Sequence, residues 1–247
     1  MAKRPVIVHF HLFKNAGTSV DRILQRNFGE KWIEIEGPNN KKLSPEGLID
    51  FIRQNPQYDA ISSHTAVVSV PIYDDIKIIP MFFVRHPIDR IRSAYDFERK
   101  QVADTPGSIK AKEGDFRHYL DWRMSSNNPW QIQEFHTFRL KDFHEFTPAK
   151  QTAFFEPRAR AAIDALPVVG LVETFDKSML DFQDLIRPHF RGFEAMRVHA
   201  NVTAKGHTVE ENVAKFADRI GEDTFQTLME LNKIDLGLYE MVKARYF

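Results

Sequence analysis

Four short apolar segments place the strongest constraint on how this chain can fold. They span residues 5–10, 58–63, 78–84 and 167–172. They are mostly rich in Val, Ile or Phe and lack the strict alternation of a half-exposed strand, which is typical of parallel strands covered on both faces. Helical patterns lie between them and predict helical crossovers from strand to strand. We therefore predict an α/β fold with a central, mostly parallel sheet flanked by helices.

Several helical segments carry recognisable start signals. Ser44 followed by Pro45 predicts an N-cap and the first position of a helix. Thr208 and Glu211 have the spacing of a capping box ahead of an apolar stripe. Asp235 is expected to cap a last helix. These signals predict a C-terminal third that is helical.

The segment 101–150 differs from the rest because aromatic, His and Arg side chains are mixed there without a strand pattern. We expect it to form helical insertions that pack over the open side of the sheet. The chain has 247 residues, enough to bury a sizeable core. Residues 1–247 are therefore predicted to form one domain that includes these insertions.

Composition argues against several classes of protein. Lys plus Arg and Asp plus Glu both number 34, so the formal net charge is zero, unlike the basic excess of most nucleic-acid-binding proteins. Cysteine is absent, which excludes disulfides, thiolate zinc sites and a cysteine nucleophile. No apolar run approaches the roughly 20 residues of a membrane-spanning helix, and the N-terminal apolar stretch is too short for a signal peptide. We expect a cytoplasmic protein with no membrane span.

The first apolar segment leads into a loop with the chemistry of an anion site. The loop and the helix start after it read Lys14-Asn15-Ala16-Gly17-Thr18-Ser19. Small residues let the backbone approach a ligand, and the two hydroxyls lie where the first helical N–H groups are unpaired. Lys14 adds a positive charge, but its place before the glycine differs from the order of a Walker A loop. The alternative interpretation is a turn and helix cap beside a solvated lysine.

A second cluster follows the third apolar segment. Arg85 directly follows this segment, Pro87 begins a helix, and Ser93 lies about two turns into it. An arginine at the carboxyl end of a parallel strand lies where α/β proteins bind ligands. Its planar fork suits a phosphate, and the Ser93 hydroxyl can add a second bond. The alternative interpretation is an amphipathic helix on which Arg90 and Arg92 form a solvated face.

Together the two clusters resemble the donor-binding motifs of sulfotransferases that use 3′-phosphoadenosine 5′-phosphosulfate (PAPS). The likeness is greatest to the carbohydrate O-sulfotransferases of the 2-O-sulfotransferase-like branch. The loop is similar to the family's 5′-phosphosulfate loop, with Phe13 where the family often has proline, and Arg-His-Pro-Ile-Asp-Arg resembles its 3′-phosphate motif. The resemblance implies a P-loop-like, three-layer fold. It also implies that residues 14–19 bind the 5′-phosphosulfate and that Arg85 and Ser93 bind the 3′-phosphate.

The resemblance further implies a reaction, the transfer of a sulfuryl group from PAPS to an acceptor hydroxyl on a carbohydrate or a small metabolite. Lys14 would stabilise charge on the departing phosphate, and a base must remove the acceptor proton. His64, directly after the second apolar segment, resembles the family's catalytic histidine, with Ser63 where the family often has glycine. His11 is the second candidate for the base. The segment 101–150 would carry acceptor specificity.

No constellation of metal ligands stands out in the sequence, and sulfuryl transfer needs no Mg²⁺. We therefore expect PAPS as the co-substrate and no metal. Two other functions remain as alternatives. One is a P-loop kinase or NTPase, against which the missing Walker A order argues. The other is a non-catalytic nucleotide-binding protein that kept the two loops and lost the chemistry.

Overall fold

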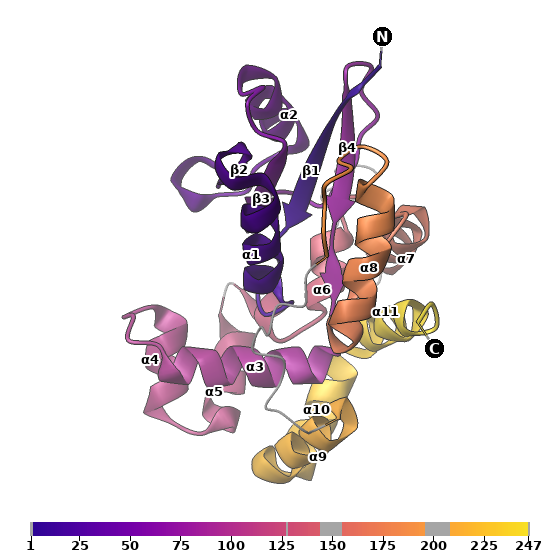
Figure 1. Cartoon of the computed structure of the whole chain (residues 1–247). Coiled ribbons are helices and arrows are strands. Elements are labelled where there is room, and N and C mark those ends of the chain that lie inside the picture. The colour runs from indigo at the N-terminus through magenta and orange to yellow at the C-terminus, as the bar shows by residue number, and fades with distance from the viewer. Residues whose placement is uncertain (1, 127, 144–154, 196–207, 247) are drawn as a thin grey trace.

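The computed structural model describes residues 2–126, 128–143, 155–195 and 208–246. Its main sheet has four parallel strands in the order β2-β3-β1-β4 (Figure 1). The strands are Trp32–Glu34 (β2), Ala60–Ser63 (β3), Arg4–Phe10 (β1) and Ile76–Met81 (β4). Ile7 of β1 pairs with Ala60 of β3 on one side and with Ile79 of β4 on the other. The predicted α/β fold with a central parallel sheet is confirmed.

Two predicted strands differ from the observed ones. The segment 78–84 is divided at Phe82 into β4 and β5 (Phe83–Val84), and the segment 167–172 contributes only β6 (Gly170–Leu171). β5 and β6 pair in a separate parallel ribbon. The Phe82 carbonyl accepts the Gly170 N–H at 2.8 Å, which extends this pairing to the break. The apolar pattern does not predict β2, because its short segment is partly exposed.

Helices make up most of the remaining structure. In the first half of the chain they are α1 (Gly17–Phe28), α2 (Pro45–Gln54), α3 (Pro87–Lys100), α4 (Pro106–Glu113) and α5 (Phe116–Ser125). In the second half they are α6 (Phe135–Leu140), α7 (Glu156–Ala165), α8 (Phe175–Ile186), α9 (Val209–Ile220), α10 (Glu222–Leu231) and α11 (Lys233–Lys243). Short 3₁₀ turns cover Gly29–Lys31, Pro38–Asn40, Pro129–Gln131 and Val172–Thr174. Within the described residues, none of the helices combines the length and the apolar character that crossing a bilayer requires.

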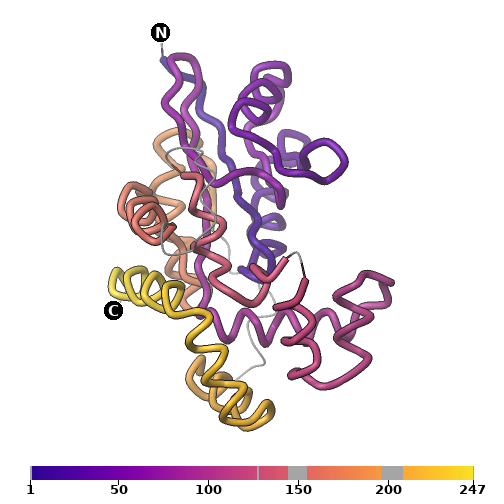
Figure 2. Tube along the Cα trace, turned by 180° about the vertical axis from the view of Figure 1, so that it is seen from behind, coloured from indigo at the N-terminus to yellow at the C-terminus, as the bar shows by residue number. Residues whose placement is uncertain are grey.

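Successive residues of β1 face two different hydrophobic cores. Val6 and Val8 pack in the core that α2, α7 and α11 share, whereas Ile7 packs in the core with α1 and α8. Figures 1 and 2 show these two helical layers on opposite faces of the strands. Because both faces are covered, both sets of alternate side chains are apolar, which explains the pattern in the sequence.

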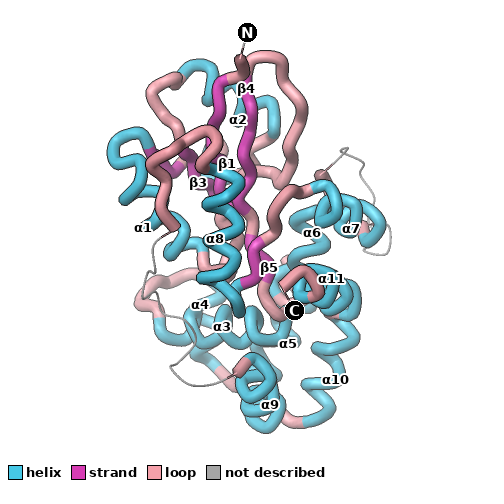
Figure 3. The backbone as a smooth tube through the Cα atoms, turned by 45° about the vertical axis from the view of Figure 1, so that its right-hand side comes forward, coloured by secondary structure: helices cyan, strands magenta, loops and turns pink. Residues whose placement is uncertain are grey.

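A further group of helices lies beyond the carboxyl ends of the strands. α3 runs across these ends, with α4 and α5 near one end and α9 and α10 below it (Figures 1 and 3). Ile91 and Tyr95 of α3, Phe116 of α5 and Phe216 of α9 share a third core. These helices therefore border the side of the sheet on which α/β proteins bind ligands.

The predicted caps at Ser44 and Thr208 are confirmed, and the one at Asp235 is wrong. The Ser44 hydroxyl accepts a backbone N–H of α2 at 3.1 Å, and Thr208 and Glu211 form both bonds of the capping box. The last helix, α11, begins after Asn232, so Asp235 lies within its first turn and is fully buried. The Asp235 carboxylate caps a different helix, α6.

Helices α6 and α11 cap each other's N-termini. The Asp235 carboxylate of α11 accepts the N–H groups of His136 and Thr137 in α6, each at 2.8 Å. Glu134, just before α6, accepts the N–H groups of Ile234 and Asp235 at 2.9 and 2.7 Å. Burial, together with the neighbouring Asp235 charge, raises the pKa of Glu134 to about 8. Each helix start thus obtains its cap from a segment about 100 residues away.

Gly170 in β6 has no room for a side chain, which makes it a test of this packing. A Cβ there would lie 2.5 Å from the ring of Phe83, which is buried against Phe175 and Phe182. We expect Gly170→Ala to lower the free energy of unfolding by about 1–3 kcal/mol, as overpacking of a core does. Urea denaturation measures this change. Gly192→Ala is the matched control, because nothing lies within 4 Å of its Cβ position; equal losses at both positions would contradict the packing described here.

Candidate functional site

A cleft of about 980 Å³ opens at the carboxyl ends of β1 and β3, and residues of α1 and α3 line it. The two predicted phosphate-binding segments, far apart in the sequence, both line it. Every predicted site residue except Asn15 contributes to the walls, and so does the second candidate base, His11. The fold therefore brings the predicted site residues together at one place.

The loop between β1 and α1 presents the start of α1 to this cleft. Lys14 and Ala16 adopt left-handed backbone conformations, with φ of 65° and 62°, which turn the chain sharply before the helix. Ala16 at the N-cap position makes no side-chain cap, and the first turn of α1 carries no acidic residue. The Ser19 N–H donates to the Ala16 carbonyl at 2.9 Å, whereas no side chain caps the N–H groups of Gly17 and Thr18 before it. Such a helix start favours an anionic ligand.

Among the residues predicted to bind the donor, Asn15 has its side chain turned into the protein. Its side-chain amide donates to the Phe83 carbonyl at 2.6 Å and lies 2.8 Å from Nε2 of His136. Its backbone N–H donates to the Leu12 carbonyl at 3.1 Å. Both its donors are used inside the protein, so Asn15 anchors the loop and does not line the cleft.

Helix α6 supports the site at two points. His136 contacts Asn15 through Nε2, while its Nδ1 lies 3.0 Å from Asp235 of α11. One turn further along α6, Arg139 donates to the backbone carbonyl of His64 at 2.9 Å. A single short helix from the segment 101–150 thus contacts both the loop between β1 and α1 and the backbone at His64.

Positive charge dominates the cleft. Among the described residues, the cationic side chains that line it are Lys14, Arg22, Arg85, Arg92 and Lys100, against the single carboxylate of Asp96. Burial, together with the neighbouring Arg85 and Arg92, lowers the pKa of Lys14. Like charges collected in this way repel one another, and an anionic ligand relieves that repulsion.

The buried carboxylate of Asp89 orients two of these arginines. Arg85 Nε donates to one of its oxygens at 2.8 Å, and Arg92 Nε donates to the other at 2.9 Å. Arg85 also donates through Nη1 to the Lys14 carbonyl at 2.9 Å, which joins the second motif to the first loop. Ser93 lines the same cleft from the next position of α3.

The interpretation of Arg90 and Arg92 as a solvated face is wrong. Arg90 is 1% exposed, with its guanidinium 4.0 Å from the ring centroid of Phe135, and it donates to the Gln131 carbonyl. Arg92 is partly buried and faces the cleft. The two arginines differ because the helices around α3 cover the side on which Arg90 lies.

Two imidazoles meet at the sheet side of the cleft. The rings of His11 and His64 have centroids 3.8 Å apart. Nδ1 of His11 lies 2.7 Å from Asp21 of α1, and Nδ1 of His9 lies 2.8 Å from the other oxygen of the same carboxylate. Burial opposes ionisation of Asp21, but the hydrogen bonds from His11 and His9 outweigh it and hold its pKa well below the ordinary value. Burial and the nearby His11 lower the pKa of His64, which favours its neutral form.

Comparison with known proteins identifies the family. The sequence model of the "Sulfotransferase family" matches residues 1–241. The chain belongs to the sulfotransferase family. An uncharacterized protein of Archaeoglobus fulgidus is 37% identical over an alignment 258 positions long, which covers 98% of each of the two chains. The family predicted from the two motifs is therefore confirmed.

This member of the sulfotransferase family has cationic cleft residues that the motifs do not reveal. Arg22 lies four positions after Thr18 in α1, and Lys100 lies seven positions after Ser93 in α3. Both spacings place a side chain on the same face of a helix as the motif residue. Helical periodicity from the motif residues is thus the signal that finds Arg22 and Lys100.

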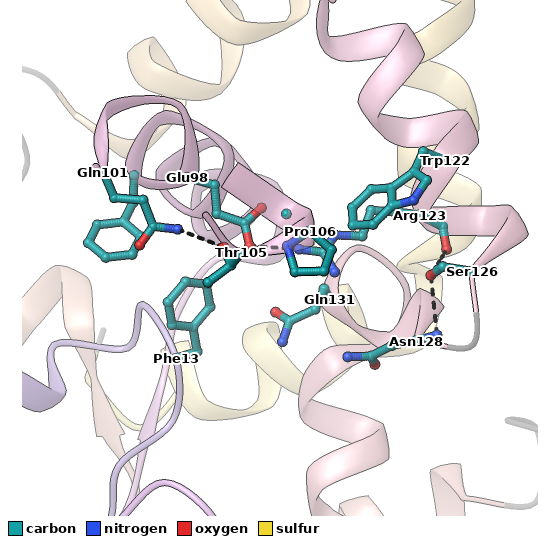
Figure 4. A pocket seen from close by; sticks show the side chains of 12 residues that line it. Phe13, Glu98, Gln101, Thr105, Pro106, Trp122, Arg123, Ser126, Asn128 and Gln131 are labelled. Atoms are coloured by element: carbon teal, nitrogen blue, oxygen red, sulfur yellow. Dashed lines mark hydrogen bonds and ion pairs between the residues drawn. The ribbon is translucent and has the colours of Figure 1, made fainter. Parts of the chain in front are cut away.

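A second cavity of about 510 Å³ adjoins the cleft of this sulfotransferase-family protein. It shares Phe13, Phe97 and Gln101 with the cleft and extends between α3, α4 and α5. Figure 4 shows Trp122 and Arg123 on one side of it and Phe13 on the other. Its walls come largely from the segment 101–150, which contributes aromatic, amide and charged groups.

Gly17 is the residue that makes room for His11 in this arrangement. A Cβ on Gly17 would lie 1.9 Å from Cδ2 of the His11 ring, so the ring would have to leave its place beside Asp21. We expect Gly17→Ala to lower the free energy of unfolding by about 1–3 kcal/mol. Urea denaturation of the single and double variants measures this loss.

The control for this prediction is a double-mutant cycle with His11→Ala, which removes the clash. Gly17→Ala should then cost less than about 0.5 kcal/mol in the His11→Ala background, since the two residues are in direct contact. Additive losses would show that His11 is not what excludes a side chain at position 17.

Proposed function

We propose that this protein transfers the sulfuryl group of PAPS to the hydroxyl of an acceptor, a carbohydrate or a small metabolite. The observation that carries the proposal is a single cleft that joins an uncapped helix start, Lys14, and the arginine and serine of the second motif. Two separate anion-binding positions in one cleft suit a donor with phosphates on both its 5′ and 3′ sides.

The loop holds the 5′-phosphosulfate. The N–H groups at the start of α1 and the hydroxyls of Thr18 and Ser19 bind its oxygens, and Lys14 adds its ammonium group. The 3′-phosphate binds beside Ser93 and the guanidinium groups of Arg85 and Arg92. Asp89 holds both guanidinium groups in place before the ligand arrives, so little ordering is needed on binding.

Transfer proceeds by in-line displacement at sulfur. The acceptor oxygen forms a bond to sulfur as the bond from sulfur to the phosphate oxygen breaks, and 3′-phosphoadenosine 5′-phosphate (PAP) leaves. Lys14 and the helix start stabilise the negative charge that grows on the departing phosphate. His64 accepts the acceptor proton, and His11, held by Asp21, is the second candidate for this role.

The acceptor enters from the side of the second cavity. That cavity shares Phe13 and Phe97 with the cleft, close to Lys14, whose ammonium lies 4.6 Å from the Phe97 ring centroid. The segment 101–150 builds most of its walls, in keeping with a role in acceptor selection.

Nucleotide binding tests the donor site. Calorimetric titration without metal should show tighter binding of PAP than of ADP, because only PAP carries a 3′-phosphate. Arg85→Ala should weaken PAP binding about 10- to 100-fold, the loss of one or two charge-assisted hydrogen bonds. Ser93→Ala should weaken it less, because a neutral donor is lost.

Arg99→Ala on the same helix is the matched control, because Arg99 is exposed and bonds to Tyr95 outside the cleft. It should bind PAP as the wild type does. A preference for ADP with Mg²⁺ would favour the kinase or NTPase alternative. Tight PAP binding without turnover on any acceptor would favour the alternative of a non-catalytic nucleotide-binding protein.

Turnover tests the role of Lys14. Chromatography of PAP released from PAPS, in the presence of a panel of carbohydrates and small alcohols, identifies a working acceptor. With that acceptor, Lys14→Ala should lower kcat about 100- to 1,000-fold, the effect of removing one transition-state donor. The exposed Lys41→Ala should leave kcat unchanged. Near-normal turnover of Lys14→Ala would exclude the proposed role.

A further inference from the structure

Three neighbouring parallel strands each end at a residue that can bind a divalent metal ion. Glu34 is the last residue of β2, His64 follows β3 directly, and His11 follows β1 directly. Because β2, β3 and β1 are adjacent in the sheet, these ends lie side by side. One ligand atom of each residue lies within 4.8 Å of those of the other two. The three side chains thus lie together at the ends of the strands, and two of them, His11 and His64, also line the cleft.

The donor set determines which ions fit. Two imidazole nitrogens and one carboxylate oxygen are ligands typical of Zn²⁺ and of neighbouring transition metals. Mg²⁺ and Ca²⁺ prefer sites built from oxygen atoms alone. The set therefore favours an ion of the zinc class.

The surroundings support two of the three ligands. Nδ1 of His11 lies 2.7 Å from Asp21, which leaves the other ring nitrogen for an ion. A carboxylate behind a histidine is the usual outer support of a metal-binding imidazole. The backbone N–H of His64 donates to Glu36 at 3.0 Å, and Arg139 binds its carbonyl, so the chain at this ligand is fixed.

The remaining freedom lies in the side chains that must close around an ion. The side chains of His64 and Glu34 are 43% and 47% exposed, and Nε2 of His64 lies 3.5 Å from Oε1 of Glu34. An ion can reach them from the open side of the cleft, and solvent can supply its other ligands.

We propose that His11, Glu34 and His64 form a binding site for one divalent transition-metal ion of the zinc class. Where His64 is the base of the proposed function, an ion at this site occupies the nitrogen lone pair of His64. That nitrogen can then no longer accept the proton of the acceptor hydroxyl, so the metal inhibits transfer. The binding site itself does not depend on that function.

Titration of metal-free protein with Co²⁺ and Zn²⁺ tests the site. Co²⁺ should produce visible absorption with a 1:1 end point, and Zn²⁺ should displace it. His64→Ala and Glu34→Gln should each weaken Zn²⁺ binding, measured by calorimetry, by about tenfold or more. Absence of a saturable 1:1 site, or unchanged affinity in His64→Ala, would overturn the proposal.

The matched control is another exposed pair of the same residue types. Nε2 of His118 lies 3.8 Å from Glu113 on the surface formed by α4 and α5, away from the cleft. His118→Ala should bind Zn²⁺ as the wild type does, and a loss there would place the ion elsewhere and contradict the site.

PAP titration of the same proteins separates the two proposals. Arg85→Ala should lose PAP affinity and keep the metal site, and His64→Ala should do the reverse. Zn²⁺ binding without PAP binding would overturn the proposed function alone, and PAP binding without Zn²⁺ binding would overturn the metal site alone.

Discussion

The reciprocal capping of α6 and α11 is the contact on which the site depends most. Each helix start is closed by a buried carboxylate from the other, Asp235 for α6 and Glu134 for α11. α6 then reaches the cleft through His136, which contacts Asn15 in the loop, and through Arg139, which binds the carbonyl of His64. Because buried polar groups without partners are costly, this pairing allows little variation in where α6 lies. The C-terminal helix therefore determines the geometry of a loop near the N-terminus.

Electrostatics impose the second constraint. The cleft collects lysine and arginine side chains, and the buried Asp89 is what keeps Arg85 and Arg92 oriented within it. The left-handed conformations of Lys14 and Ala16 turn the uncapped start of α1 toward the same space. Charges and dipoles fixed in advance stabilise a bound anion, and a transition state, without reorganising when it forms. The same rigidity places His11 and His64 beside each other at the ends of their strands.

Local signals in the sequence predicted a large part of this structure. The apolar segments located β1, β3 and β4, and the caps at Ser44 and Thr208 were correct, because strands covered on both faces and helix starts leave short-range patterns. The two loop motifs identified the family, and all of their predicted residues except Asn15 line the cleft. Predictions failed where a residue's partner is distant in the sequence. Asp235 caps α6, and Arg90 is buried against Phe135.

What the sequence alone determined, then, is the alternation of buried parallel strands with helices, the two loop motifs and the membership of the sulfotransferase family. These features depend on residues within one turn or one strand of each other. Only the tertiary structure decided that α6 and α11 hold the site, that Asp89 orients two arginines, and that Glu34 lies beside His11 and His64. These arrangements arise from the packing of distant segments, and the side chains concerned follow no local period that the sequence could reveal.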